Sequence, residues 1–166
     1  MGRLAPAAAA LTLGLMDPDA KAPLAPGTFR DPDCSDHAHV NTQTETQAIQ
    51  QLLEGMYADW NQHNIEAFMM PFWRSSELLA VIDEEVFQGW NALYKYYKNG
   101  YPDRNAMGFI SVNRIHIKLL RPDLAAAVAL WTFEYTPRHA EIVGSSTMNL
   151  EKFPEGWRII FAHWVF

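Results

Sequence analysis

Residues 109–120 read FISVNRIHIKLL, and this stretch decides the fold. Apolar residues alternate with polar ones as far as Val112, and the alternation resumes in the opposite phase from Ile115. The phase changes at Asn113-Arg114, and such a slip is the sequence signature of a β-bulge, which bends a strand. We therefore predict a long strand in a curved sheet.

Three more strands are predicted downstream, at 124–136, 142–153 and 157–165, and the turns between them contain proline or glycine. In the first of these strands Trp131, Phe133 and Tyr135 fall on one face. In the last strand, simple alternation places the following residues on one face: Trp157, Ile159, Phe161, His163 and Val165.

Upstream of these strands the pattern is helical. Thr44 and Gln47 have the spacing of a capping box, and the apolar residues that follow recur every three or four positions, which predicts a helix over about 45–62. Asn64 is expected to cap a second, short helix, and a β-pair is expected over 78–87. A third helix is expected to run from Gly89 to Gly100.

This order predicts an α+β domain over residues 43–166, in which three N-terminal helices pack on a bent antiparallel sheet. Long bent strands wrapped around helices leave a cone with a mouth, which is a natural site for a small molecule.

Residues 1–42 differ from the rest, because they are rich in alanine and proline and almost free of aromatic residues. Ala20-Lys21-Ala22 has the form of a signal-peptidase site, whereas Pro6 interrupts the apolar stretch before it. Two interpretations stay open: a signal peptide over 1–22, with a periplasmic or secreted protein, or an uncleaved flexible extension of a cytoplasmic protein.

The charge pattern narrows the class of partner. The net charge is -6 and there is no run of lysine or arginine, so nucleic acid is not an expected partner. No apolar run is long enough to span a bilayer, and a membrane is not expected either. Cys34, Asp36, His37 and His39 lie close in sequence but match no closed zinc motif, so we predict a solvated linker there and no metal or other cofactor.

The chain resembles the NTF2-like superfamily, and more closely its SnoaL-like and ketosteroid-isomerase-like branch. The motifs that carry this resemblance span about residues 44–166, and they are Trp60-Asn61, Gly89-Trp90, Tyr101-Pro102, Met107-Gly108, Gly156-Trp157-Arg158-Ile159 and His163. The resemblance implies a cone-shaped pocket, a small and largely apolar ligand, and often a homodimer that forms through the sheet.

The chain also departs from this branch. Ala162 stands where the family often has an acid before the histidine, and the isomerase tyrosine and base would fall at Met56 and near Ala80, which cannot do that chemistry. We therefore do not carry the isomerase mechanism over.

His163 is the candidate catalytic base, because an imidazole titrates near neutral pH, and the alternative is a hydrogen-bonded core histidine. The candidate pocket wall consists of Tyr57, Trp60, Trp73, Tyr97 and Trp131. Asn149 and Ser146 either orient a ligand or face solvent.

Two functions follow from these residues. The first is a cofactor-free isomerase or dehydratase that acts by proton transfer on a small apolar ligand. The second is a non-catalytic ligand-binding or dimerisation module, since one fold supports both. In either case we expect a homodimer through the exposed face of the sheet.

Overall fold

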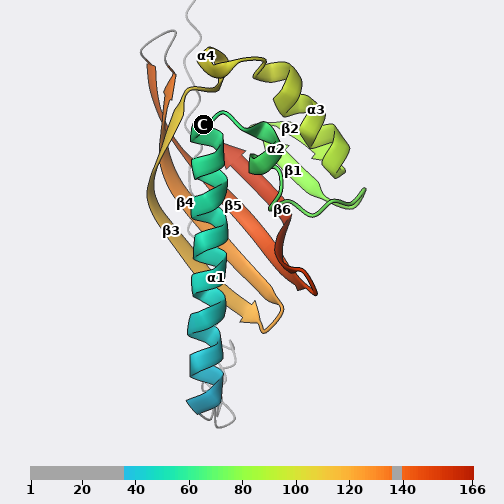
Figure 1. The fold of residues 1–166 in the computed structure, drawn as a ribbon, viewed down its shortest axis with the longest axis vertical. Helices are drawn as coiled ribbons and strands as arrows, with labels where there is room; N and C mark the ends of the chain where they lie inside the picture. The colour runs from blue at the N-terminus through green and yellow to red at the C-terminus, as the bar shows by residue number, and fades with distance from the viewer. Residues whose placement is uncertain (1–35, 136–139) are drawn as a thin grey trace, which may run out of the picture. The chain divides into compact units, whose positions relative to one another are not determined.

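The computed structural model describes residues 36–135 and 140–166, which belong to a single compact unit. In chain order its elements are α1 (Asp36–Asn61), α2 (Ile65–Phe68), β1 (Leu79–Ile82), β2 (Glu85–Gln88), α3 (Trp90–Gly100), α4 (Arg104–Met107), β3 (Phe109–Arg121), β4 (Leu124–Tyr135), β5 (Ala140–Phe153) and β6 (Gly156–Val165). The predicted order of helices and strands is confirmed except for the short helix α4, which the sequence pattern did not predict (Figure 1).

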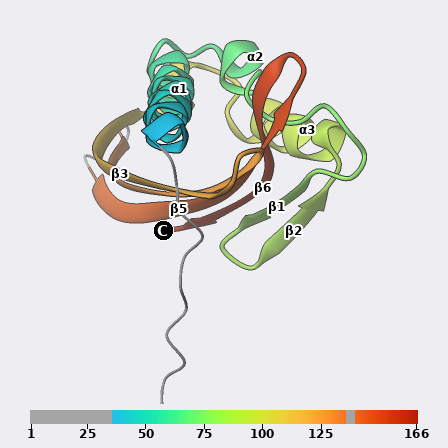
Figure 2. The same ribbon diagram turned by 90° about the horizontal axis from the view of Figure 1, so that it is seen from below.

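The strands form one six-stranded sheet in the order β2-β1-β6-β5-β4-β3. Neighbouring strands are antiparallel except β1 and β6, which are parallel. The sheet is therefore mixed, and the predicted purely antiparallel sheet is wrong in this detail. The early β1–β2 hairpin joins the last strand of the later meander, which sequence order alone does not reveal. Figure 2 shows the sheet curving around α1.

Irregularities in strand pairing produce this curvature. The predicted bulge is confirmed, because the register of β3 shifts between Val112 and Arg114. A further bulge lies in β6, where Leu150 pairs with Ile159 but Asn149 pairs with Phe161, so that Ile160 is the extra residue. A single extra residue exchanges the two faces of the strand beyond it.

The bulge overturns the prediction that one face of β6 runs unbroken from Trp157 to Val165. Trp157 and Ile159 are buried, but beyond Ile160 the buried residues are Ala162 and Trp164. We call the face that carries α1 the inner face and the opposite face the outer face. Phe161, His163 and Val165 lie on the outer face.

Helix α1 lies along the inner face, and the predicted apolar stripe is buried there: Ile49, Leu53, Met56, Tyr57 and Trp60. The helix begins at Asp36, well before the predicted start near residue 45. Residues 36–47 contain no glycine or proline to stop a helix, so Thr44 and Gln47 lie within it and do not begin it.

The other helices are short. Asn64 caps α2 as predicted, with its side chain accepting a hydrogen bond from the Ala67 amide at 3.0 Å, but α2 has only 4 residues. Helix α3 begins after Gly89, which has a φ of 85°, and it follows the β1–β2 hairpin. The domain therefore has one long helix at its start, and the predicted set of three N-terminal helices is wrong. No helix in the described ranges is long and apolar enough to cross a membrane.

Trp60 and Asn61 fasten the end of α1 to the start of β3. The Trp60 indole N–H donates to the Met107 carbonyl at 3.0 Å. The Asn61 amide donates to the Ile110 carbonyl and accepts from the Ile110 amide, each at 2.8 Å. This Trp-Asn pair is therefore a structural clamp between helix and sheet.

Trp131 fills the inside of the curved sheet. Its ring lies across the neighbouring strand β5 at Gly144, which pairs with it. A Cβ atom added to Gly144 would overlap the end of the Trp131 ring and would also lie 2.6 Å from the Val165 carbonyl oxygen of β6. The absence of a side chain at Gly144 therefore leaves room for both the indole and the neighbouring strand.

We expect Gly144→Ala to destabilise the domain by about 1–3 kcal/mol, the usual cost of overpacking a core. Urea denaturation measures this change. Gly55→Ala is the matched control, because an added Cβ at Gly55 in α1 meets nothing within 4 Å. It should raise stability by roughly 0.5–1 kcal/mol, since alanine favours a helix over glycine. Equal effects of the two substitutions would contradict this account of Trp131.

Candidate functional site

The space between the helices and the inner face of the sheet is a cavity of only about 30 Å³. Its wall consists of Tyr57, Trp60, Phe68, Tyr97, Tyr101, Ile110, Trp131, Phe133, Trp164 and Phe166. Ordinary ligand pockets measure roughly 300–1,000 Å³, whereas this volume suits about one water molecule. The predicted cone exists, but its own aromatic side chains fill it.

The rings pack mainly edge to face, the arrangement that their charge distribution favours. Trp60 is central, with ring centroids 5.1 Å from Phe68, 5.8 Å from Tyr97 and 4.9 Å from Tyr101. Phe166 contacts Trp131 in the same way at 5.2 Å. The contacts of Trp60 connect α1 with α2, α3 and the residue that follows α3, and the Trp131–Phe166 contact connects β4 with the residue that follows β6.

A small polar network lies within this apolar wall. The hydroxyl oxygen of Ser146, which is fully buried, accepts hydrogen bonds from the Trp131 indole N–H at 2.8 Å and the Tyr57 hydroxyl at 3.2 Å. Burial raises the pKa of Tyr57 to about 12, and the Ser146 hydrogen bond opposes this only in part. Burial also raises the pKa of Tyr97 well above its ordinary value. Both phenols therefore keep their protons at neutral pH.

The predicted pocket residues divide into two groups. Tyr57, Trp60, Tyr97 and Trp131 lie in the cavity wall. Trp73 does not: it is half-buried and stacks on Phe153 at 5.6 Å with an interplanar angle of 24°. The preceding Phe72 bridges to Ile159 and is buried, so Trp73 points the other way.

The structure places both His163, the candidate base, and Asn149, which was left open between ligand contact and solvent, on the outer face of the sheet. Asn149 lies between the buried residues Met148 and Leu150, and His163 between Ala162 and Trp164. The bulge at Ile160 is the physical reason that His163 lies on the outer face, because it exchanges the two faces of β6 beyond this residue. Its ring therefore does not reach the cavity wall, and its prediction as a base within the cone is wrong.

Sequence reasoning missed six residues of the cavity wall: Phe68, Tyr101, Ile110, Phe133, Trp164 and Phe166. Trp164 follows His163 directly in β6, so it faces inward once the alternation of the strand is shifted by one residue. The sequence indicates this only when the position of the bulge is known. Among the residues that the structure describes, no group of three or more metal-ligating side chains gathers into a site. Cys34, part of the predicted linker, lies outside the described ranges, and residues 36–39 belong to α1.

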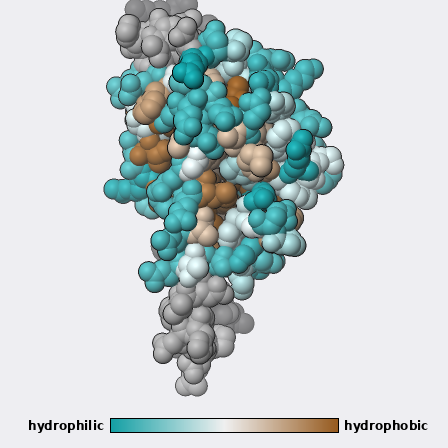
Figure 3. Space-filling view, in the orientation of Figure 1, coloured by the Kyte–Doolittle hydropathy of each residue, from teal (hydrophilic) through white to brown (hydrophobic). Residues whose placement is uncertain are grey.

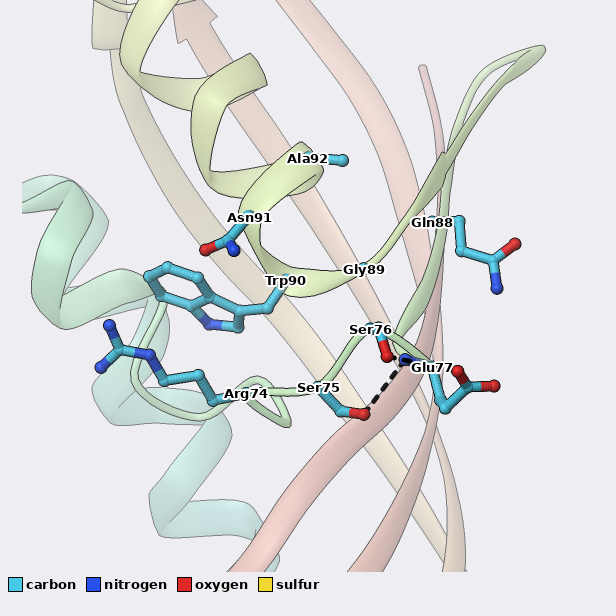
Figure 4. Close-up of a pocket in the computed structure, with 9 residues that line it drawn as sticks. All are labelled: Arg74, Ser75, Ser76, Glu77, Gln88, Gly89, Trp90, Asn91 and Ala92. Carbon is cyan, nitrogen blue, oxygen red and sulfur yellow. Dashed lines mark hydrogen bonds between the residues drawn. The ribbon is translucent and has the colours of Figure 1, made fainter.

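A second depression, wide open and about 790 Å³ in volume, lies at the start of α3. Figure 4 shows Arg74 beside the Trp90 ring, while Glu77 and Gln88 point away from them. Arg74 lies over the Trp90 ring at 4.8 Å, and Tyr94 stacks on Trp90 at 4.9 Å. The Trp90 ring is already packed against Arg74 and Tyr94, and the polar side chains around the depression do not point toward one another. The depression therefore lacks the features of a ligand-binding site.

The surface in the view of Figure 3 is largely hydrophilic, and hydrophobic residues appear there only in small groups. The exposed apolar residues that form a coherent set lie on the outer face of the sheet, as described below.

Comparison with known proteins identifies the fold. The chain is similar to an NTF2-like protein of unknown function from Shewanella oneidensis MR-1, with 28% identity, coverage of 72% of this chain and 97% of that one, and a TM-score of 0.67. It is also similar to a cystatin-like fold protein from Burkholderia xenovorans LB400, with 21% identity, coverage of 75% and 92%, and a TM-score of 0.62. An NTF2-like protein from Novosphingobium aromaticivorans shares 12% identity, with coverage of 77% and 85% and a TM-score of 0.63.

No protein-family model matches the chain, and no curated protein matches it. The curved mixed sheet around one long helix, together with these similarities, defines a protein with a cystatin-like fold. Within that class, its fold is similar to that of NTF2-like proteins of unknown function. The SnoaL-like branch stays a prediction.

We expect Ser146→Ala to lower the free energy of unfolding by about 1–3 kcal/mol, because the Trp131 and Tyr57 donors would stay buried without their acceptor. Thermal and urea unfolding measure the loss. Ser145→Ala is the control, because Ser145 lies on the outer face, and its effect should stay within about 0.5 kcal/mol. An unchanged free energy of unfolding in Ser146→Ala would show that this hydrogen-bond network does not stabilise the domain.

Alkaline pH should destabilise the domain through Tyr57. Its pKa is raised to about 12 in the folded state, so its contribution is complete below the unfolded pKa near 10 and is lost as pH rises from there through 12. Urea denaturation at pH 8 and pH 11 should show a loss about 1.4 kcal/mol smaller for Tyr57→Phe than for the unchanged protein. Equal losses in the two proteins would contradict the raised pKa.

Proposed function

We propose that this domain is a non-catalytic NTF2-like association module whose outer sheet face binds a second copy of the chain. The observation that carries the proposal is a set of exposed apolar side chains on that face, which we call the outer patch. Its members, with their exposed fractions, are Leu79 (37%), Leu130 (40%), Val143 (72%) and Val165 (46%).

The pairing of the strands brings three of these residues together. Ser145 pairs with Leu130 on one side and Val165 on the other, and Val143 is two residues from Ser145 on the same face. Leu130, Val143 and Val165 therefore surround Ser145. Apolar residues mixed with small hydroxyl side chains are suited to contact between two proteins, because they lose little by leaving water.

The charges on the outer face favour a second copy as the partner. Arg114, His116 and Lys118 are exposed along β3 at one edge of the sheet, and each pairs with an outer-face residue of β4. Asp83 and Glu84 lie in the β1–β2 turn at the opposite edge. A two-fold axis parallel to the strands would bring each basic edge toward the acidic turn of the partner, as isologous pairing requires.

The cone does not support a catalytic role as well as the outer face supports association. Proton transfer needs a titratable group with a suitable pKa in contact with the substrate. The cavity wall contains no carboxylate and no imidazole, and the pKa of its phenols Tyr57 and Tyr97 is raised by burial. The isomerase or dehydratase prediction therefore has no base within the cone.

We expect Val143→Glu to weaken or abolish the dimer, because the most exposed member of the outer patch would carry a charge into the interface. Sedimentation velocity over a range of protein concentrations should show a dimer for the unchanged chain and a shift toward monomer for the variant. The shift should correspond to at least about a tenfold rise in Kd, or about 1.4 kcal/mol.

The matched control is Met70→Glu, because Met70 is an equally exposed apolar residue, at 69%, but follows α2 and lies off the sheet. It should leave the dimer unchanged. A monomeric unchanged chain, or equal sedimentation of the two variants, would refute the proposal.

A further inference from the structure

Strand β3 forms one edge of the sheet. Among the described residues, β4 is the one strand that pairs with it, and no strand pairs with its other side. Figure 2 shows β3 at the margin of the sheet, with α1 over the inner face beside it. A sheet edge presents backbone N–H and C=O groups in the direction in which a further strand would pair.

Asn61 already occupies the beginning of this edge. Its side-chain amide accepts a hydrogen bond from the Ile110 N–H and donates one to the Ile110 carbonyl, each at 2.8 Å. A residue of a neighbouring antiparallel strand would make the same two hydrogen bonds. Beyond the bulge between Val112 and Arg114, no hydrogen bond joins the backbone of β3 to a described residue outside β4. The open part of the edge therefore begins at Arg114.

The outer-face side chains of this open part are basic. Arg114, His116 and Lys118 are exposed at every second position, and we call these three residues the basic row. Among the described residues none of them forms an ion pair, whereas Arg121, further along β3, pairs with Asp123 at 3.3 Å. Their neighbours in β4 are the uncharged residues Leu130, Val128 and Ala126. The basic row therefore follows the edge with no carboxylate directly beside it on the sheet.

We propose that the edge of β3 over residues 114–119 binds an extended acidic segment of a partner protein, which adds to the sheet as a further strand. The side chains of a strand alternate between two faces, so carboxylates at every second position of this segment would lie beside the basic row. The residues between them would lie beside the half-buried inner-face residues Ile115, Ile117 and Leu119. The segment that fits this edge therefore alternates acidic and apolar residues.

The same charges disfavour a second β3 edge as the occupant. Two such edges would bring two basic rows together, and like charges on neighbouring strands destabilise their pairing. An acidic strand gains the opposite interaction, so the basic row both discourages self-association of this edge and selects its partner. The added strand would lie beside β3 in the sheet and not over the outer patch. The proposal therefore goes beyond association through the outer patch and does not rest on it.

The experiment measures the binding of labelled peptides to the unchanged chain by fluorescence anisotropy. The test peptide alternates glutamate and valine and has blocked ends. A second peptide has the same composition with its glutamates consecutive, and a third has the test sequence with every backbone amide N-methylated. Both controls keep the charge of the test peptide but cannot pair with β3 as a strand in register. The chain should therefore bind each of them at least about tenfold more weakly than the test peptide.

Two variants of the chain carry the same change of charge at different places. Lys118→Glu puts a carboxylate into the basic row, and it should bind the test peptide at least about tenfold more weakly than the unchanged chain. Lys95→Glu is the matched control, because Lys95 is exposed on α3, which lies against β2 at the opposite edge of the sheet. Its affinity should be unchanged. Amide hydrogen exchange should slow within residues 114–119 of the unchanged chain when the test peptide is bound.

Equal binding of the three peptides would show that charge alone holds them and would overturn the proposal. Equal binding by the two variants, or no saturable binding by the unchanged chain, would overturn it as well. Circular dichroism checks that each variant is folded, and Lys118→Gln replaces Lys118→Glu if the latter is not. Val143→Glu leaves β3 intact and should bind the test peptide whether or not the outer patch forms a dimer, so the two proposals are tested independently.

Discussion

The contact of the Trp131 ring with the bare backbone of Gly144 determines the interior of this domain. Because Gly144 has no side chain, the indole lies across β5 and its N–H reaches Ser146. Ser146 also accepts a hydrogen bond from the Tyr57 hydroxyl of α1, and this bond joins the sheet to the long helix. The Trp131 ring is one of the side chains that line the small cavity of the cone, and Gly144 leaves the room that this ring occupies.

A filled cone changes what the fold is suited to do. The NTF2-like architecture provides two surfaces, the inside of the curved sheet and its outer face. In this chain the inside consists of packed rings with buried, protonated phenols, and Ser146 accepts hydrogen bonds there from Tyr57 and Trp131. The outer face instead exposes apolar side chains around Ser145. The likeness in fold is therefore compatible with a function based on association, because a fold does not fix the site placed on it.

The side chains of the interior differ in how completely they are buried and in how many hydrogen bonds hold them. Trp60 and Asn61 clamp α1 to the beginning of β3 with well-formed hydrogen bonds, and the surrounding rings are buried. Phe166 contacts Trp131 at another part of the cavity wall and is 46% exposed.

Patterns that depend on neighbours in the chain were readable from the sequence alone. The order of elements, the apolar stripe of α1, the Asn64 cap and the bulge at Asn113 each arise from local periodicity or local hydrogen bonding, and the structure confirms them. The start of α1 was misjudged because helix-compatible polar residues carry no stop signal. Only the tertiary structure decided the faces of β6, since the bulge at Ile160 forms against β5 and exchanges His163 for Trp164. It also decided that the cone is filled, because the volume left between rings depends on how distant residues such as Trp131 and Gly144 pack, which no local pattern encodes.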